Sequence, residues 1–88
     1  MQYLILLDGS EPGTGYDVMV PDLPGCFSAG DTLAGALTNA KEAIECHLEG
    51  ILMDGERIPQ PSPDIEVGTG QLVGVVSVDL AALQRAVA

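Results

Sequence analysis

The pattern of apolar and polar residues predicts strands in the first third of the chain. Residues 3–7 form a continuous apolar run, which is typical of a strand covered on both faces. Between residues 16 and 20, aromatic or apolar residues at even positions alternate with Asp17 and Met19, which predicts a strand with one preferred face. A third, short strand is expected at 26–29. Because short stretches rich in Gly, Pro and Asp separate the three segments, we expect an antiparallel meander.

The middle of the chain carries a helical pattern. Asp31 or Thr32 is the expected N-cap, and Gly55 fits the position just beyond the helix end. Between these limits apolar residues recur at the spacings of three, four and seven that form one stripe. The stripe consists of Leu33, Ala36, Leu37, Ala40, Ile44, Leu48, Ile51 and Leu52.

The last third predicts an extended connector, a strand and a short helix. Residues 54–70 lack periodicity, and Pro59, Pro61 and Pro63 alternate there, which favours a polyproline-like path. Residues 71–78 form a valine-rich strand, and residues 79–88 form a short helix that Asp79 can cap.

The predicted order in the single domain 1–88 is β-β-β-α-β-α, an α+β fold. Because a crossover helix usually joins parallel strands, we expect the fourth strand to run parallel to a strand of the meander. The expected architecture is a small mixed sheet with the main helix packed on one face.

Charge narrows the range of partners. The chain has 88 residues, with 13 Asp and Glu against 3 Lys and Arg, a net charge of −10. Because Lys41, Arg57 and Arg85 are isolated from one another, direct binding to nucleic acid or an anionic membrane is not expected. A basic protein partner is compatible with the charge. With 47% hydrophobic residues, the chain is not a disordered acidic tail.

Signals for compartment, redox state and cofactors are sparse. The sequence shows neither a signal peptide nor an apolar run long enough to span a membrane, so we expect a cytoplasmic protein. Cys26 and Cys46 are expected to be reduced and buried. Cys46 and His47 are adjacent on the helix and diverge by about 100°, so they do not readily chelate one ion. No cofactor or metal is expected.

A carboxylate nuclease is the enzymatic alternative. Asp8, Glu42 or Glu45, and Asp79 occupy elements from which two divalent metals could be held for phosphodiester cleavage. The same residues also suit a turn, a helix surface and an N-cap. Since there is no basic surface to hold RNA or DNA, we favour a protein that is not an enzyme.

Two features suit protein binding. The segment from Pro59 to Pro63 can lie along a partner's groove or pack on its own sheet as a stiff connector, and both alternatives remain open. The helix also has an acidic face with Glu42, Glu45 and Glu49, a pattern that most often marks a solvated surface.

Several blocks of the sequence, in order between about Tyr3 and Ser62, resemble the HicB-type antitoxin family. The longest and least common block is the turn and strand that precede the helix. The blocks are Tyr16-Asp17-Val18, Val20-Pro21-Asp22-Leu23-Pro24-Gly25-Cys26-Phe27-Ser28-Ala29-Gly30-Asp31-Thr32, Asn39-Ala40-Lys41-Glu42-Ala43-Ile44, His47-Leu48-Glu49-Gly50, Gly55 and Ile58-Pro59-Gln60-Pro61-Ser62.

The resemblance implies a partial ribonuclease-H-like domain without ribonuclease activity. It also implies an antitoxin of a type II toxin–antitoxin system, which binds a small basic HicA-type mRNA-cleaving ribonuclease and occludes its active site or RNA surface. Family members commonly form homodimers or larger homo-oligomers. On charge and exposure, the expected toxin contacts are Asp17, Asp22, Asp31, Pro59, Pro61 and Pro63.

The resemblance leaves two other functions open. Residues 79–88 are too short for the family's DNA-binding extension, and Arg85 is their only basic residue, so operator binding is not expected. A stand-alone HicB-like protein with metal-dependent nuclease activity, or a regulatory module with a different partner, are the alternatives.

Overall fold

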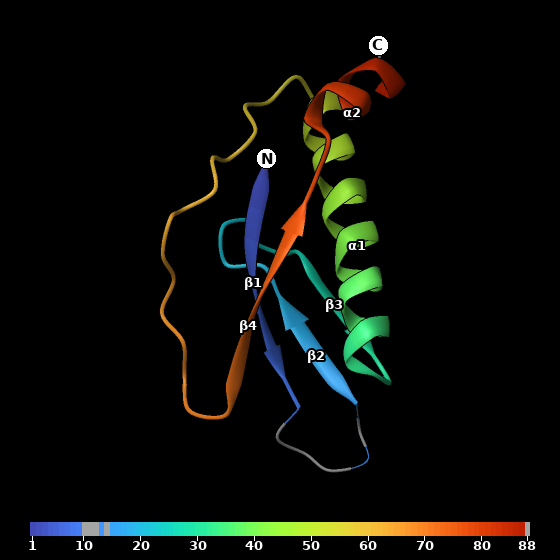
Figure 1. The fold of residues 1–88 in the computed structure, drawn as a ribbon. Coiled ribbons are helices and arrows are strands. Elements are labelled where there is room, and N and C mark those ends of the chain that lie inside the picture. The colour runs from blue at the N-terminus through green and yellow to red at the C-terminus, as the bar shows by residue number, and fades with distance from the viewer. Residues whose placement is uncertain (10–12, 14, 88) are drawn as a thin grey trace.

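The computed structural model describes residues 1–9, 13 and 15–87, and within them the predicted order of elements is confirmed (Figure 1). Four strands and two helices make an α+β fold. The elements are β1 (Gln2–Asp8), β2 (Tyr16–Met19), β3 (Phe27–Gly30), α1 (Leu33–Met53), β4 (Gln71–Ser77) and α2 (Leu80–Val87).

The sheet has the strand order β3-β2-β1-β4, and every neighbouring pair is antiparallel. The expected mixed sheet is therefore wrong. β4 pairs with β1 along its whole length, from Gln71 opposite Asp8 to Ser77 opposite Gln2.

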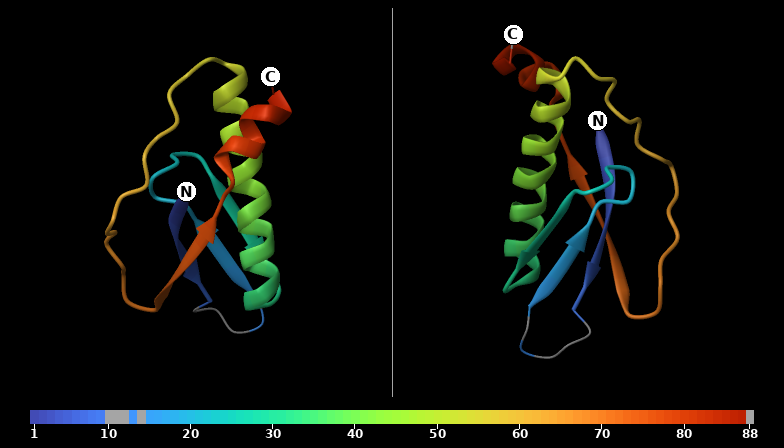
Figure 2. Two further views of the ribbon diagram at one scale, coloured as in Figure 1. Left: turned by 45° about the horizontal axis from the view of Figure 1, so that its top comes forward. Right: turned by 180° about the vertical axis from the view of Figure 1, so that it is seen from behind.

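The connector explains this orientation. Figures 1 and 2 show α1 running the length of the sheet on one side and residues 54–70 running back on the other. An extended chain advances about 3.3 Å per residue, against about 1.5 Å in a helix, so this segment spans the return easily. Between β3 and β4 the chain thus runs the length of the sheet twice, once in α1 and once in the connector. If β4 ran parallel to β1, one such run would have been enough.

Local hydrogen bonds set both ends of α1. The Thr32 hydroxyl accepts a hydrogen bond from the Gly35 N–H at 3.0 Å, so Thr32, rather than Asp31, is the N-cap. At the other end Gly55 has a φ of +71°, and its N–H donates to the Leu52 carbonyl. This left-handed residue ends the helix where the sequence predicted.

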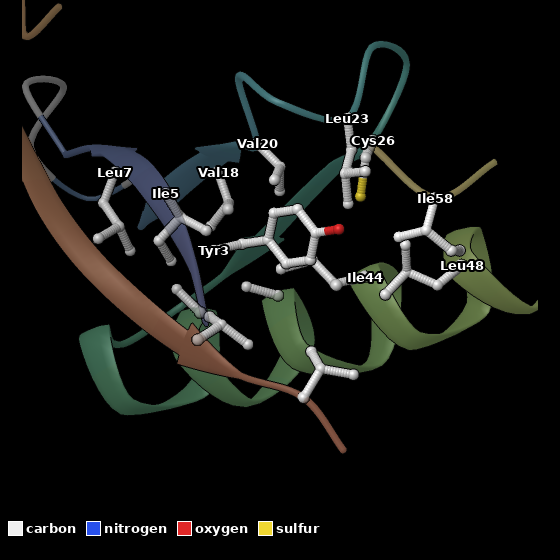
Figure 3. Packing of buried hydrophobic residues seen from close by; sticks show 14 of the residues in the cluster. Tyr3, Ile5, Leu7, Val18, Val20, Leu23, Cys26, Ile44, Leu48 and Ile58 are labelled. Carbon is white, nitrogen blue, oxygen red and sulfur yellow. The ribbon is translucent and has the colours of Figure 1, made fainter. Parts of the chain in front are cut away.

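The core lies between α1 and the face of the sheet that we call the inner face. Alternate residues of β1, Tyr3, Ile5 and Leu7, point into it, and Figure 3 shows the Tyr3 ring among them. The helix supplies four fully buried residues at helical spacing. The buried cluster is Tyr3, Ile5, Leu7, Val18, Val20, Leu23, Cys26, Ala36, Ala40, Ile44, Leu48, Ile58, Val76, Val78 and Leu83.

The short helix α2 closes one end of this core. Asp79 accepts a hydrogen bond from the Ala82 N–H at 3.1 Å, which is the predicted cap. Leu83 is the buried residue of α2, and α2 packs against α1. Residues 79–87 therefore complete the domain core.

Candidate partner-binding surfaces

The face of the sheet opposite α1, which we call the outer face, carries an apolar row that crosses all four strands. Phe27 of β3 lies opposite Met19 of β2, Met19 lies opposite Leu6 of β1, and Leu6 lies opposite Val73 of β4. Leu6 is buried, but Phe27, Met19 and Val73 keep 65%, 39% and 47% of their surface exposed. We call these four residues the outer row.

A groove lies beside the outer row, between the outer face and the connector. Its volume is about 320 Å³. Gln2, Leu4 and Val75 form its floor, and Pro61, Ser62 and Pro63 form its wall. Apolar side chains and proline rings dominate this lining, so the groove suits an apolar side chain more than a charged ligand.

A double hydrogen bond fixes the connector beside this groove. The Asp22 carboxylate accepts from the Ser62 N–H at 2.6 Å and from the Ser62 hydroxyl at 2.7 Å. We call this pair the Asp22–Ser62 clamp. Because both donors come from one residue, the clamp fixes the direction of the chain there as well as its position.

Tyr3 makes the second attachment. Its hydroxyl donates a 2.6 Å hydrogen bond to the carbonyl of Pro59. Burial raises the pKa of the Tyr3 phenol, and the negative charge of Asp22 raises it further. The phenol is therefore kept protonated, which is the form that donates this bond.

These attachments bear on the two interpretations of the proline segment. Pro59 and Pro61 are half-buried against their own molecule, so this part serves as a stiff connector. Pro63 is exposed and borders the groove. The segment thus packs on its own sheet and leaves Pro63 exposed at the groove.

The six expected contact residues fall into two groups at opposite ends of the sheet. Asp17 is the second residue of β2, and Asp31 follows the end of β3 that pairs with the start of β2, so both exposed acids lie at one end. Asp22, in the turn after β2, lies at the other end with Pro59, Pro61 and Pro63. Asp8 of β1 lies directly opposite Asp17 and adds a third carboxylate to the first group.

The residues of the nuclease alternative do not come together. Asp8 pairs with Gln71 at the start of β4, whereas Asp79 follows the opposite end of β4 and caps α2. The antiparallel orientation of β4 is what separates them, because a parallel β4 would have ended beside Asp8. Among the described residues, no group of three His, Cys, Asp or Glu side chains could hold a metal ion.

The two cysteines differ in environment. Both are free, and Cys26 is buried as expected, but Cys46 is exposed, so that part of the expectation is wrong. Cys46 is two residues from the buried Ile44, and two residues rotate a helix by about 200°, which places it on the far side. Burial raises the pKa of the Cys26 thiol, and the negative charge of an ionised Cys46 raises it further.

Sequence reasoning missed the outer row. It placed emphasis on charged residues, although Met19 in an alternating strand and the uncharged run 71–77 were visible signals. The pairing that aligns them could not be read from the sequence, because it depends on the register of four strands.

None of the helices in the described ranges is long and apolar enough to cross a membrane.

Comparisons with known proteins match this architecture. A 14.9 kDa uncharacterized protein from the rep-hol intergenic region of Haemophilus phage HP1 is 56% identical over 72 residues, which cover 75% of this chain and 53% of that protein. Antitoxin HicB 1 of Photorhabdus laumondii is 40% identical over 63 residues, covering 72% of this chain and 40% of the antitoxin. The chain thus spans about half the length of these relatives or less.

Solved structures share the fold. The N-terminal domain of the Burkholderia pseudomallei antitoxin HicB superposes with a TM-score of 0.73 at 32% identity, covering 90% of this chain and 99% of that domain. A chain of a HicA3 and HicB3 toxin–antitoxin complex gives a TM-score of 0.71 at 32% identity, with the same coverage of both chains. The family model for the HicB-like antitoxin of bacterial toxin–antitoxin systems matches residues 3–88. This chain belongs to the HicB-like antitoxin family.

Proposed function

We propose that this chain is an antitoxin that binds a small basic ribonuclease toxin of the HicA type. The observation that carries the proposal is the family match over residues 3–88, together with the fold shared with a chain of the HicA3 and HicB3 complex. Neutralisation would follow from covering the toxin's active site or its RNA-binding surface. The chain itself would not act as an enzyme or need a cofactor.

The charge of the chain supports this partner. A ribonuclease that holds RNA needs a basic surface, because phosphate contacts dominate its affinity. A protein with a net charge of −10 competes with RNA for such a surface. Complementary charge of this kind raises the association rate and the specificity more than the affinity itself. Since Lys41, Arg57 and Arg85 are isolated, we propose that this chain does not itself hold operator DNA.

We propose that the six residues expected from the sequence contribute to toxin binding in two different ways. Asp17 and Asp31 are exposed and would attract the basic toxin directly. Asp22 already accepts two hydrogen bonds from Ser62, so it would act by fixing the connector, which carries Pro59, Pro61 and Pro63. The first group would attract the toxin by its negative charge, and the second would hold a rigid surface against which the toxin packs.

The proposal also covers the cellular location of the protein and its self-association. The protein would act in the cytoplasm, where the toxin meets mRNA. It would also self-associate, since 47% hydrophobic residues is a high fraction for so small a chain.

Co-expression with a small basic protein encoded beside this chain's gene tests the proposal. We expect growth to be rescued and a complex to copurify. Asp17→Lys with Asp31→Lys should weaken capture at least tenfold. The same charge change at Asp54 and Glu56, which are exposed near the C-terminal end of α1, is the matched control and should weaken it less.

Three outcomes would contradict the proposal. Absence of both rescue and complex formation would remove the antitoxin function. Equal weakening by the two double variants would show that net charge, rather than the end of the sheet with Asp17 and Asp31, controls binding. Magnesium-dependent cleavage of RNA that Asp8→Asn abolishes would mean that neutralisation is not the whole function.

A further inference from the structure

β4 is an edge strand without the usual protection. In the described part of the chain, β1 is its one neighbour in the sheet. Edge strands usually carry charged residues or prolines that prevent another strand from pairing with them. The stretch from Gln71 to Ser77 contains neither, and its side chains are mostly aliphatic.

The apolar side chains of β4 are exposed on both faces of the sheet. Leu72 lies opposite Leu7 on the inner face and is 49% exposed. Val73 and Val75 lie on the outer face and are 47% and 53% exposed. A seven-residue strand that shows three large apolar side chains together with unpaired backbone groups is a template for strand addition.

The outer row leads to this edge and stops there. From Phe27 it passes through Met19 and Leu6 to Val73, and the adjacent pair of Leu4 and Val75 runs beside it. A strand added to β4 would extend the row across the edge. The exposed valines would then be covered by side chains from the added strand.

We infer that the free edge of β4 is the interface between two copies of this chain, joined by antiparallel pairing of β4 with β4 of the partner. Such pairing is self-complementary about a two-fold axis, because each strand presents the same edge to the other. Opposed residues of antiparallel strands share a face, so Val73 and Val75 of each copy meet the odd-numbered residues of the other. The two outer rows then form one apolar stripe across eight strands.

The distribution of charge favours a second copy of this chain, rather than a strongly basic protein, as the partner that pairs with the edge of β4. Two chains of −10 repel each other at most surfaces, but β4 carries no charged residue, so they can approach there. A strongly basic protein gains no electrostatic attraction from the same edge. It would be drawn instead to ends of the sheet that carry carboxylates, such as the one with Asp17 and Asp31.

The inference rests on the self-association within the proposed function and is independent of the toxin. Light scattering coupled to gel filtration, on the chain alone over a wide concentration range, measures the dimer dissociation constant. Val73→Lys and Val75→Lys place like charges next to the two-fold axis, so each should raise this constant by about tenfold or more. Phe27→Lys, at an exposed apolar residue of the same face on the opposite edge, should change it less than threefold.

Amide hydrogen exchange gives a second measurement that needs no variant. Outward-facing N–H groups of β4 should be protected at high protein concentration and lose that protection on dilution. The N–H groups of β2, an interior strand, should not respond to dilution.

The outcomes separate the two levels of the proposal. A chain that is monomeric at every concentration would overturn both self-association and this interface. A dimer that survives both valine substitutions but is lost in Phe27→Lys would overturn the interface alone. A monomeric chain whose capture of the toxin is lost in Val75→Lys would show that the edge binds the toxin instead.

Discussion

Asp22 and Ser62 are 40 positions apart in the chain, yet two hydrogen bonds of 2.6 and 2.7 Å join them. The bonds connect the turn after β2 to the connector that precedes β4. Because the connector determines the direction in which β4 enters the sheet, this pair contributes to the topology as well as to local order.

Asp22→Ala is expected to lower the free energy of unfolding by about 1–3 kcal/mol, the usual cost of losing hydrogen bonds to a charged group. The Ser62 N–H and hydroxyl would lose their acceptor. The connector after Ser62 should then become sensitive to proteases before the domain unfolds. Urea denaturation and limited proteolysis measure the two effects.

Asp17→Ala is the matched control for the clamp, because it removes an exposed carboxylate of the same kind. It should leave the proteolysis pattern unchanged. Equal protease resistance of Asp22→Ala and wild-type protein would mean that the proline packing, and not the clamp, holds the connector.

Tyr3→Phe tests the second attachment and has a defined pH dependence. Near pH 7 the substitution should cost about 1 kcal/mol, because the Pro59 carbonyl loses its hydrogen bond. Burial raises the pKa of Tyr3 in the folded protein above the ordinary value of about 10, so ionisation favours the unfolded chain. The stabilisation is present below that ordinary value and is lost as the pH rises through the raised pKa.

The measurement is the difference in unfolding free energy between wild type and Tyr3→Phe from pH 8 to pH 11. Any contribution of Cys26, whose pKa is also raised, is common to both proteins and cancels in the difference. The wild-type protein should lose stability faster above about pH 10. Parallel curves across this range would contradict the proton linkage of Tyr3.

Element order was predictable because its signals are local. The stripe from Leu33 to Leu52, the cap at Thr32 and the left-handed Gly55 all act within a few residues. The direction of β4 was not predictable in this way. It depends on where residues 54–70 travel, which is set by contacts such as Tyr3 with Pro59 that lie 56 positions apart.

For the candidate surfaces, too, local features were predictable from the sequence and long-range placement was not. The sequence identified exposed acids correctly at Asp17 and Asp31, since charged residues in turns and alternating strands usually face solvent. It did not show that these two lie at the opposite end of the sheet from Asp22. The sequence indicated a valine-rich strand at 71–78, and the exposure of its side chains became visible only once β4 was found at the edge of the sheet.

The two thiols should react with Ellman's reagent at different rates. Cys46 is exposed on α1 and should react quickly in the native protein. Cys26 is buried and its pKa is raised, so it has little thiolate and should react only as the domain opens. Cys46→Ser should therefore remove the fast phase and leave the slow one. A fast phase that persists in this variant would show that Cys26 is accessible.

Two glycines of this fold should respond in opposite ways to the same substitution. A Cβ placed on Gly30 of β3 would lie against the backbone N and Cα of Ala36, in the first turn of α1. Backbone atoms cannot move aside as a flexible side chain can. Gly30→Ala should therefore lower the free energy of unfolding by about 1–3 kcal/mol, as overpacking usually does.

Gly50→Ala is the matched control. Gly50 lies inside α1, and a Cβ there would meet nothing within 4 Å. Because alanine favours a helix interior over glycine, this substitution should raise the free energy of unfolding by about 0.5–1 kcal/mol. Urea denaturation of both variants measures the difference in sign. If Gly30→Ala is as stable as wild type, β3 and α1 cannot be as close as the structure has them, and the capping turn at Thr32 would have to shift with them.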